Sequence, residues 1–265
     1  RICLVGSEMC IRDSYFTYAS VNESSTNEVK ETYPAISKLV LSILKNYPFW
    51  IVFSSILILG STTIMFNKNL IYYIKYALDL HNYQGLVLGL SGLSSFASIP
   101  FWSYVSLKIG KRNTWQISMS LLLLAFALFY YYQINSIQEL IIIVCLIGIA
   151  SGAGGVLFWS MLPDTIEYGE WKSGIRSESS LYGFMTFAQK SSIAVAALIL
   201  GVLLTSINFT PNEVQNPETL AGLKNIMSLI PASGIAISIF LMYFYPINSE
   251  YHKELLINIE ARKNG

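Results

Sequence analysis

The stretch QELIIIVCLIGIASGAGGVLFWSML, residues 138–162, decides the fold, because it is long, apolar and almost free of charge. Glu139, near its start, is the one charged residue in it. A helix needs about 20 predominantly apolar residues to cross the hydrocarbon core of a bilayer. A helix also satisfies its own backbone hydrogen bonds, as lipid requires. The stretch therefore predicts a transmembrane helix.

Stretches of the same character recur on both sides of this one. The further predicted spans are 47–67, 84–107, 114–133, 182–206 and 226–245. The composition agrees, since 53% of the 265 residues are hydrophobic and 12% are charged, whereas soluble domains carry about 25% charged residues. The mean hydropathy is +0.50. We expect an all-α membrane protein, a bundle of six transmembrane helices over residues 47–245.

The positions of Lys and Arg predict the orientation, because short cytoplasmic loops retain positive charge. Most basic residues precede the first span or follow the second, fourth and sixth: Lys30, Lys38, Lys45, Lys108, Lys111, Arg112, Lys172, Arg176, Lys253, Arg262 and Lys263. The opposite loops hold little beyond Lys68, Lys75 and Lys224. We therefore expect a multi-pass protein of the cell membrane with both ends, including the tail 246–265, in the cytoplasm. The formal net charge of +1 gives no basic footprint for a nucleic-acid partner.

Residues 15–46 are expected to form a cytoplasmic loop that contains an amphipathic helix. Residues 15–33 are rich in Ser, Asn, Thr and Glu and are typical of a linker. In the following stretch, YPAISKLVLSILKN, the apolar residues recur at helical spacing: Ile36, Leu39, Val40, Ile43 and Leu44. This pattern predicts a helix that lies in the membrane interface. The alternative is a polar linker that leads directly into the first span.

Lys190 is the clearest functional candidate, because an ionisable residue inside a span is costly unless it has a role or a nearby interface. It lies in LYGFMTFAQKSSIAVAAL, where Tyr182, Thr186 and Lys190 are spaced to share one helix face. A phenol, a hydroxyl and an ammonium group on one face suit a water-filled cavity. The alternative is that the long stem of Lys190 lies in lipid and its ammonium reaches the cytoplasmic interface.

Tyrosines near the end of the first span form a second candidate face. In NKNLIYYIKYAL, Asn69, Tyr72, Tyr73 and Tyr76 follow helical spacing. A tyrosine ring can pack on the C–H surface of a sugar while its hydroxyl forms a hydrogen bond. The alternative is an aromatic belt at the outer membrane interface, where tyrosine is common.

The connection after the fourth span, MLPDTIEYGEWKSGIRSESS, is the most charged part of the core sequence. Asp164, Glu167, Glu170 and Glu178 alternate there with Lys172 and Arg176. Ion pairs that form in one state only would bias a conformational equilibrium, so this loop is a candidate latch. The alternative is a solvated loop whose surface pairs contribute about 0–1 kcal/mol each.

The sequence offers nothing for an enzyme or a metal centre. The three cysteines, Cys3, Cys10 and Cys145, are too few and too scattered for a disulfide framework or a metal site. His81 and His252 are far apart and lack a ligand set. The spans contain no nucleophile with a base and no paired acids. We expect no catalysis, no cofactor and no metal.

Two motifs resemble a known family. MLPDTIEYGEWKSGIRSE followed by LYGFMTFAQKSS is similar, without insertions, to the charged loop and lysine-bearing helix of the glycoside-pentoside-hexuronide:cation symporters, the melibiose permease group of the major facilitator superfamily. NLIYYIKYAL resembles their tyrosine-rich seventh helix, and SLKIGKRN resembles the basic turn after the eighth. In that turn the usual acidic residue is absent, with Leu107 near its place, which weakens the expectation of a charge relay there. The resemblance covers about residues 34–260, the C-terminal six of twelve helices.

The resemblance implies symport of a sugar or glycoside with Na⁺ or H⁺ by alternating access between two six-helix bundles. Lys190 matches the lysine tied to cation and sugar binding, Thr186 matches a sugar-proximal position, and Tyr182 matches more weakly. Asp164 and Arg176 match charged positions of the cytoplasmic gate loop, whose motif also contains Glu167, Tyr168, Glu170 and Glu178. The tryptophan that some members place in the sugar site has no match at its position, although Trp159 lies nearby.

The family's cation-binding carboxylates lie on its first six helices, which this sequence does not contain. We therefore expect the chain to be half of a transporter, with the missing N-terminal six-helix half as its partner and the main ligands of the coupling cation in that half. The alternatives are a major facilitator of another branch that carries a non-sugar solute, and a six-span membrane protein that does not transport.

The opening stretch LVGSEMCIRD, residues 4–13, has neither helical nor strand periodicity. Back-translated, it reads as a transposon adapter from sequencing-library preparation. We therefore interpret residues 1–14 as an adapter artefact to be excluded from the fold. The alternative is a genuine cytoplasmic segment that matches by coincidence.

Overall fold

A computed structural model describes residues 36–134 and 136–264. The adapter interpretation of residues 1–14 and the linker prediction for 15–33 lie outside these residues. The described chain consists of helices: α2 (Ile36–Leu44), α3 (Tyr47–Tyr72), the π-helix η1 (Tyr73–Ala77), the short 3₁₀-helix η2 (His81–Tyr83), α4 (Gln84–Ile109), α5 (Lys111–Tyr131), α6 (Ile137–Ser173), α7 (Glu178–Ser206), α8 (Pro217–Tyr243) and α9 (Ser249–Asn264).

Six of the described helical segments are long and apolar enough to cross a membrane, which confirms the predicted all-α, six-helix membrane bundle. The helices extend beyond the predicted spans where the sequence turns polar. Hydropathy marks only the part that lipid surrounds, and a helix continues into water until a residue stops it. In α6 that residue is Gly174, whose left-handed φ of 72° ends the helix while its N–H bonds Glu170 O at 2.8 Å.

The connection after the fourth predicted span is therefore largely helical. Asp164, Glu167, Tyr168 and Glu170 lie on the last turns of α6, and Arg176 and Glu178 follow its end. Pro163 lies inside the helix and lacks an N–H group, so the carbonyl of Trp159 loses its usual partner. The adjacent carbonyl of Ser160 accepts a hydrogen bond from Lys111 Nζ at 2.6 Å. The motif is thus displayed on one helix and a short turn.

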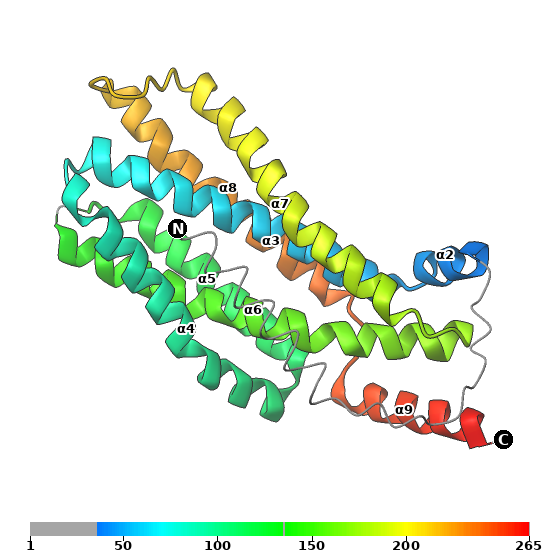
Figure 1. Ribbon diagram of the computed structural model, residues 1–265. Coiled ribbons are helices and arrows are strands. Elements are labelled where there is room, and N and C mark those ends of the chain that lie inside the picture. The colour runs from blue at the N-terminus through cyan, green and yellow to red at the C-terminus, as the bar shows by residue number, and fades with distance from the viewer. Residues whose placement is uncertain (1–35, 135, 265) are drawn as a thin grey trace, which may run out of the picture. The chain divides into compact units, whose positions relative to one another are not determined.

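The core lies where α3 and α6 pack with α5 and α8 (Figure 1). α4 packs mainly on α6, and α7 packs mainly on α3, so these two helices flank the others. Both contribute little to the interior. On α7 the buried residues recur every three or four positions, from Leu181 through Met185, Ala188 and Ser192 to Ala196. One narrow stripe of α7 is therefore buried, and the rest of its surface, including Lys190, is exposed.

Glycines bring α4 and α6 into close contact. A Cβ atom on Gly148 would lie 2.7 Å from Ser91 O, and one on Gly152 would lie 2.6 Å from Ser95 O. The Cβ atom on Gly148 would also clash with Ser94 Oγ, and the one on Gly152 would clash with Ser98 Oγ. Small residues four apart allow such backbone approach in membrane helices. By contrast, a Cβ atom on Gly85 or Gly89 would meet no atom within 4 Å, so these two glycines lie at no helix contact.

The N-terminal end of α3 is tied to α6 through Asn46. Its side-chain oxygen accepts a hydrogen bond from Phe49 N at 3.3 Å and caps α3, while its Nδ2 donates to Thr165 O at 2.8 Å. α2 lies at this end of the bundle, with Ile43 buried and Ser42 Oγ 2.8 Å from Ser173 Oγ. The residues of the predicted tail form α9, which buries Leu255 and Ile259 and packs on α6.

Candidate functional site

The largest cavity beside Lys190, here called the Lys190 cavity, has a volume of about 630 Å³. Residues of α3, α4, α5, α6 and α7 line it. Its polar and aromatic lining comprises Thr63, Ser95, Ser151, Phe158, Trp159, Gln189, Lys190 and Ser192, and its other side chains are apolar. Lys190 is the one charged side chain among the described residues that line it. A cavity with hydroxyls, an indole and one ammonium group can bind a polyhydroxylated solute by hydrogen bonds and ring packing.

The three predicted residues of α7 lie along one face of that helix. Thr186 Oγ1 donates to Tyr182 O at 2.9 Å, and both Thr186 and Lys190 are exposed. The ring of Tyr182 stacks on that of Trp159, with centroids 6.5 Å apart and planes inclined by 19°. Trp159 lines the Lys190 cavity, whereas Tyr182 and Thr186 lie beyond its lining. The structure thus connects Tyr182 to the cavity through Trp159.

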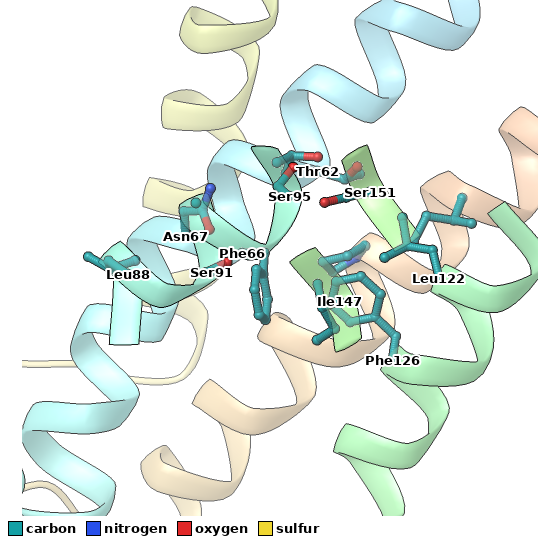
Figure 2. Close-up of a pocket in the computed structure, with 14 residues that line it drawn as sticks. Thr62, Phe66, Asn67, Leu88, Ser91, Ser95, Leu122, Phe126, Ile147 and Ser151 are labelled. Atoms are coloured by element: carbon teal, nitrogen blue, oxygen red, sulfur yellow. The ribbon is translucent and has the colours of Figure 1, made fainter. Parts of the chain in front are cut away.

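A second cavity, here called the serine pocket, has a volume of about 300 Å³ and shares Thr63, Ser95 and Ser151 with the first (Figure 2). Its other polar lining residues are Thr62, Asn67 and Ser91. Phe66 and Phe126 form its apolar side, with ring centroids 5.0 Å apart and a T-shaped arrangement. The two cavities are therefore neighbours, and the side chains that they share come from α3, α4, α5 and α6.

The two predicted tyrosines of the first span lie away from this region. Tyr73 is buried, with its ring centroid 5.7 Å from that of Phe129. Tyr76 lies at the end of η1, where its hydroxyl accepts a hydrogen bond from Asn212 N at 2.8 Å and its ring packs on Phe209. Neither residue lines the Lys190 cavity or the serine pocket. Tyr76 joins the end of α3 to the connection between α7 and α8.

A cluster of charged groups, here called the Asp164 cluster, lies near the C-terminal end of α6. Asp164 is buried, and Lys111 Nζ lies 2.7 Å from both of its carboxylate oxygens. His252 of α9 lies 2.5 Å from Glu167 Oε2 and 3.5 Å from Asp164 Oδ1 through its Nε2 atom. The cluster therefore joins the start of α5, the end of α6 and α9.

Donor atoms of Asp164, Glu167 and His252 lie within 4.8 Å of one another, a spacing that a metal ion could bridge. The ammonium group of Lys111, however, already neutralises Asp164 through both oxygens. A divalent cation would have to replace this ammonium, since two positive charges repel at such short range. The geometry accordingly favours an ion-pair cluster.

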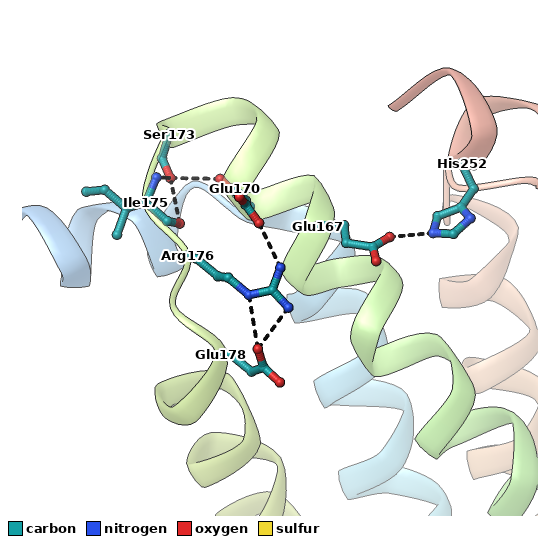
Figure 3. Close-up of polar contacts among 8 residues, drawn as sticks. Glu167, Glu170, Ser173, Ile175, Arg176, Glu178 and His252 are labelled. Atoms are coloured by element: carbon teal, nitrogen blue, oxygen red, sulfur yellow. Dashed lines mark hydrogen bonds and ion pairs between the residues drawn. The ribbon is translucent and has the colours of Figure 1, made fainter. Parts of the chain in front are cut away.

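Arg176 bridges the end of α6 and the start of α7. Its guanidinium lies 3.1 Å from Glu170 Oε2 and 2.9 Å from Glu178 Oε2 (Figure 3). The hydrogen bond to Glu178 is the largest cause of a raised pKa for this guanidinium, which stays charged. Tyr168, on the same last turns of α6, is buried and packs edge-on against Tyr47, with ring centroids 5.5 Å apart.

Several residues of the Asp164 cluster and of the two cavities were not predicted from local sequence patterns. Lys111 and His252 reach Asp164 and Glu167 across long sequence separations, which local patterns do not report. Ser91 and Ser95 lie four apart on α4, so their shared face could have been noticed. Nothing local indicated that Asn67 and Ser151 join that face from α3 and α6.

Six described helical segments are able to cross a membrane, and residues from five of them line the Lys190 cavity. The chain belongs to the family described as MFS/sugar transport protein, whose model matches residues 3–249. Members of this family are transporters and not enzymes, as the sequence predicted.

Three relatives illustrate the similarity. The chain is 25% identical over 250 residues to the glucuronide carrier protein homolog of Escherichia coli K12, covering 94% of this chain and 54% of the relative. It is 33% identical over 156 residues to a putative sulfoquinovose importer of the same strain, covering 58% and 33%. It is 23% identical over 252 residues to the isoprimeverose transporter of Lactiplantibacillus pentosus, covering 94% and 52%. The chain thus spans about half the length of the first and third of these.

Proposed function

We propose that this chain is the C-terminal half of a secondary active transporter that couples uptake of a sugar-like solute to Na⁺ or H⁺. The observation that carries the proposal is the Lys190 cavity, which is walled by five helices and contains one ammonium group among hydroxyls and an indole. The hydroxyl, amide and ammonium groups of this lining can form hydrogen bonds with a hydroxylated solute, and the apolar part of the lining can pack on its C–H surface. An alternating-access mechanism would expose it to each side of the membrane in turn.

The proposal of a missing half is supported by lengths and by exposure. The glucuronide carrier homolog and the isoprimeverose transporter each match over about half of their length, 54% and 52%. α4 and α7 bury few of their residues, although both are apolar helices. A second six-helix bundle against these helices would close the cavity from the other side, as in transporters built from two repeats.

We infer that the solute is a sugar or glycoside that bears an acidic group. Lys190 is the one charged side chain among the described lining residues, and an unpaired ammonium favours a carboxylate or sulfonate partner. Two of the relatives are named for acidic sugars, glucuronide and sulfoquinovose. The isoprimeverose transporter, by contrast, is named for a neutral sugar.

The coupling cation needs ligands that the described cavity does not supply. Na⁺ favours hard oxygen ligands such as carboxylates, and H⁺ needs a group that titrates. No carboxylate is among the described residues that line the Lys190 cavity or the serine pocket. We therefore place the main cation ligands in the missing half.

The Asp164 cluster and the Arg176 bridge are proposed to act as the cytoplasmic gate. They hold the ends of α5, α6 and α7 together by ion pairs and join α9 to α6 through the contact between His252 and Glu167. Formation of these pairs in one conformation and loss in another would shift the equilibrium between them. In this arrangement, the end of the bundle with α2 and α9 faces the cytoplasm, in the cell membrane.

Uptake of radiolabelled sugars into proteoliposomes tests the proposal. The chain is joined to its upstream coding sequence, and uptake is driven by an imposed Na⁺ or H⁺ gradient. We expect gradient-driven uptake of at least one acidic sugar, and a loss of about 10-fold to 100-fold in Lys190→Ala, as expected for a hydrogen bond to a charged group. Lys253→Ala, an exposed lysine of α9, is the control and should transport normally.

Each failure has a separate meaning. Normal uptake by Lys190→Ala would remove Lys190 from the site. Uptake of a non-sugar solute in place of any sugar would assign the chain to another branch of the superfamily. Absence of uptake in a folded, full-length protein over a broad solute panel would support a six-span membrane protein that does not transport.

A further inference from the structure

A third cavity lies between α2 and the C-terminal end of α6, away from the solute region. Its volume is about 240 Å³. At roughly 30 Å³ per water molecule, this volume corresponds to about eight water molecules, which is enough space for a phosphodiester group. Ser42 and Ser173 lie on its wall, 2.8 Å apart through their hydroxyl oxygens. Gly169, which adds no side chain, also lines it.

Three lysines line this cavity: Lys38 on α2, Lys45 directly after α2, and Lys172 on the last turn of α6. Within the described residues, no carboxylate lies within 4.0 Å of any of these three ammonium groups, and no acidic residue lines the cavity. Three like charges around one cavity repel one another unless an anion joins them. The charge of the cavity is therefore complementary to a phosphate.

Lys172 is held at the cavity by its neighbours. Its Nζ donates to Lys45 O at 3.2 Å and lies over the rings of Tyr47 and Tyr168, 5.6 and 5.5 Å from their centroids. These contacts restrict the lysine side chain, so less conformational entropy is lost when an anion binds. The ammonium is oriented before any ligand arrives.

An apolar stripe of α2 continues from the cavity. Ile36, Val40 and Leu44 are 80%, 48% and 60% exposed and lie four residues apart on one helix face. Leu41, which is 50% exposed, lines the cavity itself. Exposed apolar side chains next to a cationic cavity match the two parts of a phospholipid, because acyl chains and headgroup meet at the same depth of the membrane.

We propose that this cavity is a binding site for the headgroup of an anionic phospholipid such as phosphatidylglycerol, with the acyl chains along the apolar stripe of α2. The phosphate would contact the ammonium groups of Lys38, Lys45 and Lys172. A bound lipid would hold α2 against the end of α6, next to the Arg176 bridge. The site is independent of which solute the bundle transports.

Native mass spectrometry of the detergent-purified 265-residue chain tests this site. The chain is titrated with phosphatidylglycerol and with phosphatidylcholine of the same acyl chains. We expect one retained phosphatidylglycerol per chain and weaker retention of phosphatidylcholine. K38Q/K45Q/K172Q should lower the affinity for phosphatidylglycerol by about 10-fold or more, since each lysine near an anionic lipid contributes about 1 kcal/mol.

Two control variants distinguish binding at this cavity from a general effect of positive charge and from an effect of the substitutions on folding. K68Q/K108Q/K253Q removes the same charge at exposed lysines elsewhere and should bind phosphatidylglycerol as the unmodified chain does. K38R/K45R/K172R keeps the charge and should also retain the lipid. The proposal would be overturned if K68Q/K108Q/K253Q lowered the affinity for phosphatidylglycerol as much as K38Q/K45Q/K172Q does. Equal retention of both lipids by the unmodified chain would also overturn it.

The same experiment also tests two other anionic groups as occupants of the cavity. If a large excess of inorganic phosphate displaces phosphatidylglycerol, the cavity binds a free phosphate and the lipid proposal is wrong. If phosphatidylglycerol binds only after E23Q/E28Q/E31Q, the chain's own acidic segment occupies the cavity, and the lipid proposal again fails. We expect neither result.

Discussion

Lys111 Nζ lies 2.7 Å from both carboxylate oxygens of Asp164, so the residue that starts α5 neutralises a buried acid on α6. The side chain of Asp164 is 7% exposed and that of Lys111 is 33% exposed. Removing the lysine leaves a buried carboxylate without its partner. We expect Lys111→Gln to lower the free energy of unfolding by about 2 kcal/mol.

A double-mutant cycle checks this pair. Chemical unfolding in detergent is measured for Lys111→Gln, Asp164→Asn and the double variant. The double variant should lose less stability than the two single losses together, because neither partner is then left unpaired. Additive losses would show that the two side chains do not stabilise each other.

Close packing of α4 on α6 predicts opposite results for two similar substitutions. Gly148→Ala places a Cβ atom 2.7 Å from Ser91 O and should destabilise the protein by about 1–3 kcal/mol. Gly89→Ala meets no atom within 4 Å and should be neutral or stabilising by up to about 1 kcal/mol, because alanine favours the helix. Thermal unfolding of both variants measures the difference. Equal effects would contradict the helix contact.

The side chain of Asn46 forms two hydrogen bonds, and two substitutions distinguish their contributions to stability. Asn46→Ser keeps an oxygen that can cap α3 but loses the bond from Nδ2 to Thr165 O, and should cost about 1 kcal/mol. Asn46→Ala loses both and should cost about 2 kcal/mol. The free energy of unfolding is measured for each variant. Identical losses would mean that only one of the two contacts contributes.

Tyr245 predicts an alkaline limit of stability. Its ring is fully buried and its hydroxyl has no hydrogen-bond partner among the described residues. Burial, followed by the nearby charge of Asp164, raises the pKa of Tyr245 well above its usual value of 10.0. As the pH rises, Tyr245 therefore loses its hydroxyl proton in the unfolded chain before it does so in the folded protein. The free energy of unfolding is unaffected by this group below pH 10 and falls as the pH rises further.

Tyr245→Phe removes this contribution and the unpaired hydroxyl. We expect the variant to be more stable by about 1 kcal/mol at neutral pH and to lose less stability between neutral pH and pH 11 than the unmodified chain. Thermal unfolding over that pH range measures both effects. A variant with an unchanged alkaline limit would show that Tyr245 ionises as easily in the folded protein as in the unfolded chain.

The six spans could be predicted from the sequence because their physical cause is local. Every stretch that lipid surrounds must be apolar over its whole length, and residues 138–162 show this without any partner. The ends of the helices could not be predicted in the same way. The first turns of α8 and the last turns of α6 lie in polar sequence, where a cap such as Gly174 sets the boundary.

The site could be predicted only where its residues lie on one helix. The common face of Tyr182, Thr186 and Lys190 follows from helical spacing, and Lys190 lines a cavity. Their roles in binding remain predictions. The same spacing argument put Tyr73 and Tyr76 on one face, for solute binding or for an aromatic belt, yet Tyr73 is buried against Phe129 and Tyr76 binds Asn212. Spacing gives a face but does not say which neighbour that face meets.

α6 runs from Ile137 to Ser173 with Pro163 inside it, and it contains both Trp159 of the Lys190 cavity and Glu170 of the Arg176 bridge. At 1.5 Å per residue, these two residues are about 16 Å apart along the axis. A rigid tilt of about 10° around Trp159 would therefore move Glu170 by about 3 Å, enough to break a hydrogen bond. In the proposed gate, a tilt of α6 that leaves Trp159 in place at the Lys190 cavity would therefore separate Glu170 from Arg176 at the far end of the helix.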